Sequence, residues 1–307
     1  MENKVLRGFR IFRQEPYPDM LRRLIREQVD LSVAYCRQPE LNPDIAIHEI
    51  RKSTKRVRAV NRLCRSVTET DFYRQTSGKY REISQLLAQL RLSAVYLETL
   101  GNLTDDRKLS VSTRVLKKLF NELMAKHKKL TNRQIHQEKI MDRIHALLHQ
   151  ELSQPEIILP ENIEFKILVE NIQKTYCRGM ESLDTVMQHP VTENLHNLRK
   201  SVKYLWNQYC LLRPIWPPVM TVFIRQLDQL AEKLGYDHDL AEMEYFLLNE
   251  HTVKSGAETG QLVEFIAGKR KQIQKTITPL AMYLYAEKPC AMAKRLTGYE
   301  EVYRNKV

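Results

Sequence analysis

The stretch His-Glu-Ile-Arg-Lys-Ser-Thr-Lys at residues 48–55 returns 148 positions later, at residues 196–203, as His-Asn-Leu-Arg-Lys-Ser-Val-Lys. Five of the eight positions are identical, and a sixth exchanges one aliphatic residue for another. A repeat at so long a period is not typical of a solenoid and indicates duplication of a whole helical unit. The part kept in both copies is a histidine followed by helically spaced cations, so function is best sought there.

The remaining sequence predicts an all-α fold. The 307 residues include only nine glycines, show little alternation of β-branched residues, and carry long stretches of 3.6-residue periodicity. We expect a turn at Ser77-Gly78 and four helices in each half. The expected helices cover approximately residues 19–36, 42–67, 78–101, 111–151, 165–187, 192–213, 224–234 and 262–286.

Pro155 and Pro160 mark the best linker between the halves. The predicted organisation is an N-terminal extension (1–16), a first four-helix bundle (17–152), a linker (153–160), a second four-helix bundle (161–298) and a C-terminal tail (299–307). If the bundles are related by pseudo-two-fold symmetry, the two repeated helices face each other. They would then line one basic central groove or pore.

The chain is strongly basic, with a formal charge of +12 and a pI near 9.4. This favours a polyanionic partner such as nucleic acid, polyphosphate or an anionic membrane surface. No segment is long and apolar enough to predict a membrane span, and the N-terminus lacks the apolar core of a signal peptide. The five cysteines form no Cys-x-x-Cys pair, which favours reduced thiols in a cytoplasmic protein over disulfides or zinc.

The first repeat lies on an amphipathic helix with one cationic face. On a helical wheel its cations fall within roughly 60° of the line through His48; they are Arg51, Lys52, Lys55, Arg58 and Arg62. Stacked like charges destabilise a helix, and a bound anion would relieve their repulsion. The alternative is a solvated basic face paired with acids on neighbouring helices. In the second copy His196, Lys200 and Lys203 share a face, with Arg199 at its edge.

His238 lies between Asp237 and Asp239 in the sequence Leu-Gly-Tyr-Asp-His-Asp at residues 234–239. Such a group raises the question of a metal ion or a general base. Consecutive residues of a helix point in different directions, so we expect no metal site. A histidine oriented by a carboxylate near the basic channel, or a packing histidine, is the favoured interpretation.

Together these motifs resemble the CHAD family, the conserved histidine α-helical domain. The resemblance rests on the repeated His-x-[Leu/Ile]-Arg-Lys-x-x-Lys, the Leu-Gly-x-x-His-Asp element and the tail Leu-Tyr-Ala-Glu-Lys-Pro at 284–289, and it spans about residues 18–296. It implies two pseudo-symmetric four-helix bundles around a basic pore that binds inorganic polyphosphate, often at polyphosphate granules. The matching positions are His48, Arg51, Lys52, Lys55, His196, Arg199, Lys200, Lys203 and His238, to which the helical wheel adds Arg58 and Arg62.

Two departures from the family pattern bear on function. Ala94 and Val95 stand where the first half should have a cation and an aspartate, so that part of the constellation is expected to be lost. The N-terminus lacks the Glu-x-Glu-x-Lys opening of the triphosphate tunnel enzymes sometimes fused to this family. We therefore predict non-catalytic polyphosphate binding, without cofactor or metal. The alternatives are a nucleic-acid binder using the same basic face, or an enzyme with His48 or His196 as a phosphoryl acceptor.

Overall fold

A computed structural model describes residues 8–37, 42–153, 161, 163–250 and 256–305 of the protein. Within these ranges every regular element is helical, which confirms the all-α prediction. The α-helices are α2 (Tyr17–Arg37), α3 (Pro43–Leu63), α4 (Thr70–Leu86), α5 (Ala88–Thr104), α6 (Thr113–Thr131), α7 (Ile140–Ser153), α8 (Phe165–Gln188), α9 (Thr192–Leu212), α10 (Pro217–Asn249), α11 (Gly256–Leu284) and α12 (Pro289–Asn305). A π-helical segment, η1 (Asn132–Gln137), follows α6, and a 3-10 turn, η2 (Arg213–Ile215), follows α9.

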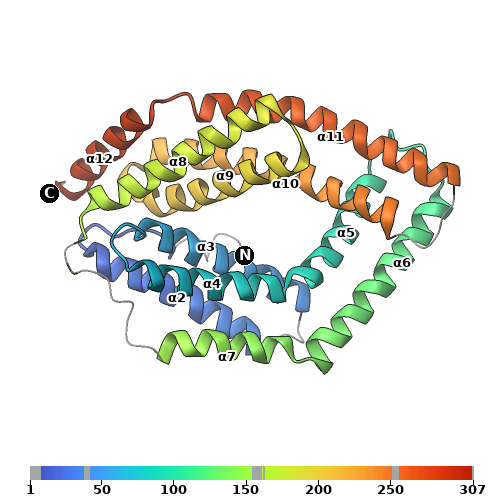
Figure 1. The fold of residues 1–307 in the computed structure, drawn as a ribbon, viewed down its shortest axis with the longest axis horizontal. Helices are drawn as coiled ribbons and strands as arrows, with labels where there is room; N and C mark the ends of the chain where they lie inside the picture. The colour runs from blue at the N-terminus through green and yellow to red at the C-terminus, as the bar shows by residue number, and fades with distance from the viewer. Residues whose placement is uncertain (1–7, 38–41, 154–160, 162, 251–255, 306–307) are drawn as a thin grey trace.

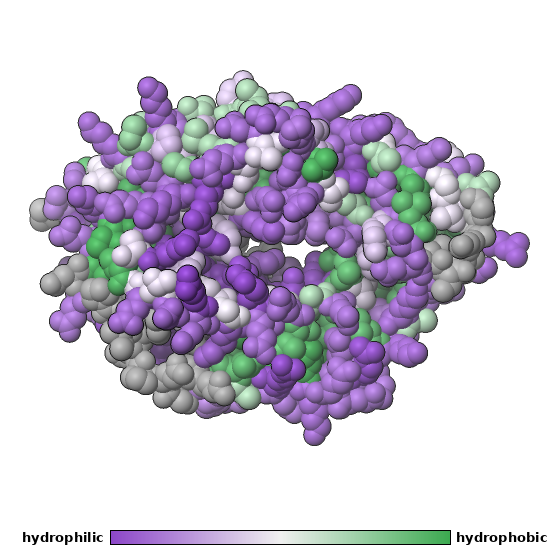
Figure 2. Space-filling model, in the orientation of Figure 1, coloured by the Kyte–Doolittle hydropathy of each residue, from purple (hydrophilic) through white to green (hydrophobic). Residues whose placement is uncertain are grey.

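The helices form an elongated ring around a central opening (Figure 1). α2, α3 and α4 lie on one side of this ring, α8, α9 and α10 on the other, and α5 and α6 close one end. In the space-filling view a hole is visible near the middle of the face, surrounded mainly by hydrophilic residues (Figure 2). Among the helices of the described ranges, none is both long and apolar enough to cross a bilayer.

One hydrophobic core joins the two sides of the ring. It contains Ile50 of α3 together with Leu168 of α8 and Leu198 of α9, all without solvent exposure. The Asn171 side chain of α8 also donates to the Leu63 carbonyl at the end of α3, with an N···O distance of 3.1 Å. The two halves of the chain therefore pack directly on each other along α3.

A second, smaller core lies at the end of the ring where α5 and α6 meet α10 and α11. Tyr96 of α5 stacks against Phe246 of α10 with ring centroids 5.0 Å apart, and Leu119 of α6 and Leu262 of α11 are buried around them. This core holds α5 against α10. The central opening is thereby bounded by helices from both halves of the chain.

The helix boundaries differ from the prediction in the first half. α4 continues through Ser77-Gly78, where a turn was expected, and the break falls at Leu87. Gly78 is exposed, and a helix tolerates one interior glycine at a cost of about 1 kcal/mol relative to alanine. The long helix expected over 111–151 is interrupted by η1 and by Lys139, whose φ of 49° lies in the left-handed region.

Both expected terminal extensions take part in the fold. Phe9 and Ile11 are buried in the main core, and the Ile11 amide donates to the Leu211 carbonyl of α9 at 3.1 Å. Residues 299–305 belong to α12, a helix that the sequence pattern did not predict, and the Arg304 guanidinium binds the Glu15 carbonyl at 3.0 Å. These contacts attach both segments to the helices next to them, the division into two bundles stays a prediction, and residues 154–160 of the expected linker lie outside the described residues.

Candidate functional site

The local sequence places the repeated cations on the exposed faces of α3 and α9. α3 begins as expected, with Asn42 accepting the Ile45 amide at 3.1 Å and proline as the first helical residue. Ile47, Ile50 and Val57 are buried on its inner face. The repeated cations lie on the other side of α3, which also contacts α5 and α9.

Five cations from three helices meet in what we call the central cluster. Its members are Arg51 and Lys55 of α3, Arg91 of α5, and Arg199 and Lys203 of α9. Lys55 experiences the positive charge of the other four. Desolvation by the surrounding protein, and then repulsion from the four cations, lower the pKa of Lys55 to about 7. The pKa of Arg51 is also lowered, by burial and then by Arg91 and Arg199.

The two motif arginines are held in place by backbone features of neighbouring helices. Arg51 donates to the Ser84 carbonyl of α4 at 2.5 Å. Arg199 lies against α10 at Gly235, where a Cβ would come within 3.0 Å of its Nη2 atom. Gly235 belongs to the Leu-Gly-x-x-His-Asp element, so one function of that glycine is to leave room for the guanidinium.

Arg91 is a member of the cluster that the sequence analysis missed. The expected loss at Ala94 and Val95 led us to regard the first half as lacking its cation, and those two side chains are indeed buried and apolar. Arg91 lies one helical turn earlier and supplies the positive charge instead, next to His48, Arg51 and Lys55. It is held by a bidentate ion pair with Glu98, at 3.1 and 3.0 Å.

The three predicted histidines border the cluster. The ring centroids of His196 and His238 lie 4.5 Å apart, and neither buried Nδ1 atom has a hydrogen-bond partner among the residues that the structure describes. Burial, followed by nearby cations that include Arg199, lowers the pKa of His196 and lowers that of His238 to about 4. The pKa of His48 is lowered by desolvation and then by Arg91. In the free protein the His238 ring is therefore neutral near neutral pH.

The two aspartates beside His238 point to different partners. Asp237 is 1% exposed and accepts hydrogen bonds from Arg270 at 3.3 Å and Gln274 at 2.8 Å, which tie α10 to α11. Asp239 lies near Arg199 and Arg91, and burial raises its pKa. In the described part of the chain, no three histidine, cysteine or acidic side chains are grouped as metal ligands would be.

The remaining motif lysines have local partners. Lys52 pairs with Glu49 of its own helix at 3.2 Å, and Lys200 donates to Asn197 at 3.0 Å. Lys203 lies 3.8 Å from Asp228 and 3.7 Å from Glu232. These acids offset part of the positive charge, as the solvated-face alternative requires, but they leave Arg51, Lys55 and Arg199 without an ion pair among the described residues.

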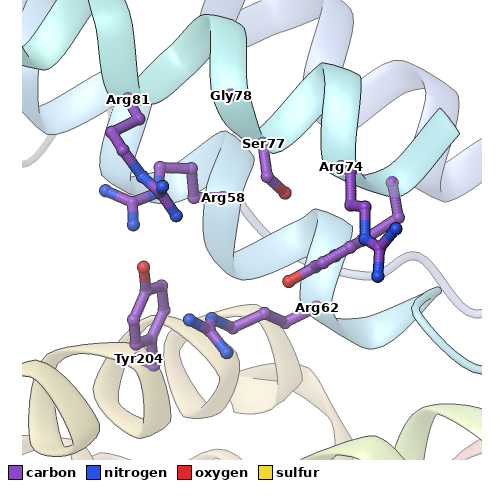
Figure 3. A pocket seen from close by; sticks show the side chains of 8 residues that line it. Arg58, Arg62, Arg74, Ser77, Gly78, Arg81 and Tyr204 are labelled. Atoms are coloured by element: carbon purple, nitrogen blue, oxygen red, sulfur yellow. The ribbon is translucent and has the colours of Figure 1, made fainter. Parts of the chain in front are cut away.

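Arg58 and Arg62 lie farther along α3 in a separate pocket. Arg62 stacks on the Tyr204 ring of α9, with 3.9 Å from its guanidinium carbon to the ring centroid, and Arg58 lies 5.8 Å from the same ring. The pocket has a volume of about 220 Å³. Its lining residues, shown in Figure 3 with all but Tyr73 labelled, are Arg58, Arg62, Tyr73, Arg74, Ser77, Gly78, Arg81 and Tyr204. The α4 members form a helical stripe that the sequence analysis did not single out.

Comparison with known proteins identifies the family and the fold. The family model described as CHAD domain matches residues 23–248. The fold is similar to that of PptA from Streptomyces chartreusis, with a TM-score of 0.59 and 16% identity, covering 89% of this chain and 100% of that one. It is also similar to the CHAD domain from the plant Ricinus communis, with a TM-score of 0.54, 14% identity and 93% of each chain covered.

No individually curated protein matches the chain. The low identities of the two solved structures make their likeness one of fold. The family model is independent of that comparison and covers most of the chain, including both copies of the repeated motif. The protein therefore belongs to the CHAD domain family.

Proposed function

We propose that the protein binds inorganic polyphosphate at the central cluster and its bordering histidines, without catalysing a reaction. The observation that carries the proposal is the position of Lys55 among Arg51, Arg91, Arg199 and Lys203. An arrangement that lowers the pKa of a lysine to about 7 is unfavourable for its charged form in the free protein. A polyanion would relieve it.

The chemistry of the cluster suits a flexible chain of phosphates. Arginine forks and lysine ammonium groups form short, charge-assisted hydrogen bonds with phosphate oxygens. The cations come from three helices, α3, α5 and α9, so a bound chain would contact all three. The resemblance of the sequence motifs to the CHAD family points to the same ligand, and association with polyphosphate granules is part of this proposal.

We also propose that α3 and α9 derive from a duplicated unit and that the two halves were once equivalent four-helix bundles. The support is that equivalent motif residues converge: Arg51 and Lys55 from the first copy meet Arg199 and Lys203 from the second. The two copies now differ in their surroundings. Lys203 has acidic neighbours on α10, whereas Lys55 has none among the groups that shift its pKa.

The decisive experiment measures the affinity for long-chain polyphosphate after Arg51, Lys55, Arg199 and Lys203 are replaced together with alanine. We expect a loss of about a hundredfold or more and a shallower dependence of log K on log salt, because fewer counterions are released. The control replaces four exposed cations of α6, Arg114, Lys117, Lys118 and Lys129, with alanine. It removes four cations from a helix outside the central cluster, so equal losses in the two variants would contradict the proposal.

Two further arms separate polyphosphate binding from the alternatives. A nucleic acid at matched phosphate concentration should displace polyphosphate poorly, because the Tyr204 ring is stacked by Arg62 and the Trp206 ring by Lys203 at 4.4 Å, which leaves these rings less available for bases. Incubation with magnesium and polyphosphate should release no phosphate. Efficient displacement by nucleic acid would favour a nucleic-acid-binding protein instead. Phosphate release that the quadruple variant lacks would favour an enzyme.

A further inference from the structure

The pocket between α3 and α4 is built almost entirely of hydrogen-bond donors for an anion. Arg58 and Arg62 enter it from α3, and Arg74 and Arg81 enter from α4, separated by two helical turns on one face. Figure 3 shows these side chains and the hydroxyl groups of Ser77 and Tyr204 around one shared space. No acidic residue lines the described pocket.

The pocket differs chemically from the central cluster. Its charge comes from arginines alone, whose planar forks match pairs of phosphate oxygens, whereas the central cluster combines three arginines with two lysines. Arg74 is its only member with an ion pair in the described structure, at 3.7 Å from Asp71, and both partners are largely exposed. Exposed pairs of this kind contribute little energy, so Arg74 remains available to a ligand.

The aromatic side chains of the pocket support the arginines. The Tyr204 ring is covered by Arg62 at 3.9 Å, and the Tyr73 ring by Arg65 at 5.2 Å. With those faces engaged, the tyrosines fix guanidinium positions and leave their hydroxyl groups for hydrogen bonds. The pocket therefore suits a compact phosphate group better than the base of a nucleotide.

The number of arginines indicates which phosphate group fits best. A terminal phosphate, like a phosphomonoester, carries close to two negative charges at neutral pH and three acceptor oxygens, and an internal phosphate has fewer of both. Arg58 is three residues from Lys55, about 4.5 Å along the helix axis. A chain that occupies the central cluster can thus end in the pocket.

We propose that this pocket binds the terminal phosphate group of an oligophosphate or polyphosphate, separately from the internal phosphates at the central cluster. The proposal rests on the function proposed above and refines it, by assigning the two regions of the α3 stripe to different parts of the ligand. The terminal group belongs either to the end of a long bound chain or to a free short oligophosphate. In both cases Arg58, Arg62, Arg74 and Arg81 neutralise it.

The test compares polyphosphate chains of one length with free ends and with both terminal phosphates capped as alkyl esters. We expect the protein to bind free-ended chains about tenfold more tightly, because the alkyl ester removes charge-assisted hydrogen bonds of the terminal phosphate. Gly78→Glu places a carboxylate in the pocket, where a Cβ meets nothing within 4 Å, and should abolish this preference. Arg81→Ala should reduce it.

Two control variants separate charge from bulk and from folding. Ala125→Glu adds the same charge to an exposed position of α6, remote from the pocket, and should keep the full preference. Gly78→Gln adds nearly the same volume without charge, so it must reduce the preference for free-ended chains less than Gly78→Glu does. Circular dichroism of all variants checks that the helical fold is intact.

Binding of tripolyphosphate distinguishes the source of the terminal group. If Gly78→Glu weakens tripolyphosphate binding and long chains show no free-end preference, the ligand is a free oligophosphate. If long chains do not bind at all, the function proposed for the central cluster fails. The effect of Gly78→Glu on tripolyphosphate affinity then tests the pocket by itself. The pocket proposal is overturned if capping has no effect and Gly78→Glu leaves tripolyphosphate affinity unchanged.

Discussion

The guanidinium of Arg199 lies directly against the backbone of α10 at Gly235, so that a Cβ at this glycine would come within 3.0 Å of Nη2. This contact joins the second copy of the repeated motif to the Leu-Gly-x-x-His-Asp element. It also places Arg199 beside Arg51 and Lys55. The glycine acts on the cluster through the position of the arginine.

Gly235→Ala is expected to weaken polyphosphate binding about three- to tenfold, because the guanidinium must move away from the cluster. The change also gains up to about 1 kcal/mol of helix propensity, so the melting temperature should not fall by more than a few degrees. Titration calorimetry and thermal unfolding measure the two effects. Unchanged affinity would show that Arg199 needs no such positioning.

Arg91→Ala is expected to reduce polyphosphate affinity about tenfold, although Arg91 lies outside the repeated motif. The matched comparison is Glu98→Gln, which removes the ion-pair partner of Arg91 and retains the cation. That variant should bind at least as tightly as the original protein, because a competing carboxylate is gone. Equal losses in the two variants would mean that the ion pair, and not the cation, matters.

Binding of polyphosphate at pH 8 is expected to take up a proton at Lys55. The free protein holds the pKa of Lys55 at about 7, so most of this side chain is neutral at pH 8, and a bound polyanion restores the charged form. Affinity should therefore fall as pH rises above 7. Calorimetry in buffers of different ionisation enthalpy measures the uptake, which Lys55→Ala should remove.

The lowered pKa of Lys55 also predicts how the stability of the free protein depends on pH. The unfolded chain binds more protons than the folded one between pH 7 and the ordinary lysine pKa, here 10.5. The free energy of unfolding therefore rises with pH in this window and falls as pH decreases toward 7, where the folded protein must hold Lys55 charged. In Lys55→Met, denaturant unfolding should show a weaker rise of stability with pH in that window, and an unchanged pH profile would contradict the shift.

Gly179→Ala is expected to destabilise the fold without altering the binding site. A Cβ at this position of α8 would collide with the buried hydroxyl end of Tyr285. Overpacking of this kind costs about 1–3 kcal/mol, less the small gain in helix propensity. Urea unfolding measures the loss. Polyphosphate affinity at low temperature should stay the same, since Tyr285 belongs to the main core and not to the central cluster.

The local signals in the sequence predicted the motif helix well. Asn42 and Pro43 marked the start of α3, and the spacing of Arg51 and Lys55 predicted one cationic face. These features depend on contacts within a single helix. The same reasoning failed at Gly78, because glycine lowers helix propensity but an exposed glycine does not by itself end a helix that neighbouring residues hold in the fold.

The parts of the site that the sequence did not reveal come from contacts between helices. Arg91 joins the cluster because α5 packs on α10, and Arg74 and Arg81 line a pocket because α4 packs on α3. Neither relationship has a fixed spacing in the chain. Cations on the helices next to the repeated ones belong to no repeated motif, so the sequence alone does not mark them as site residues.

The core that joins α3 to α8 and α9 has a consequence for ligand choice. The shared core holds α3 against α9 and α8 before a ligand arrives, and the hydrogen bond from Asn171 of α8 to the Leu63 carbonyl adds to it. The protein then loses little conformational freedom on binding, and most of the entropy loss falls on the flexible partner. An already extended polyanion loses less freedom than a coiled one, so chain stiffness as well as charge decides which polyanion is held most tightly.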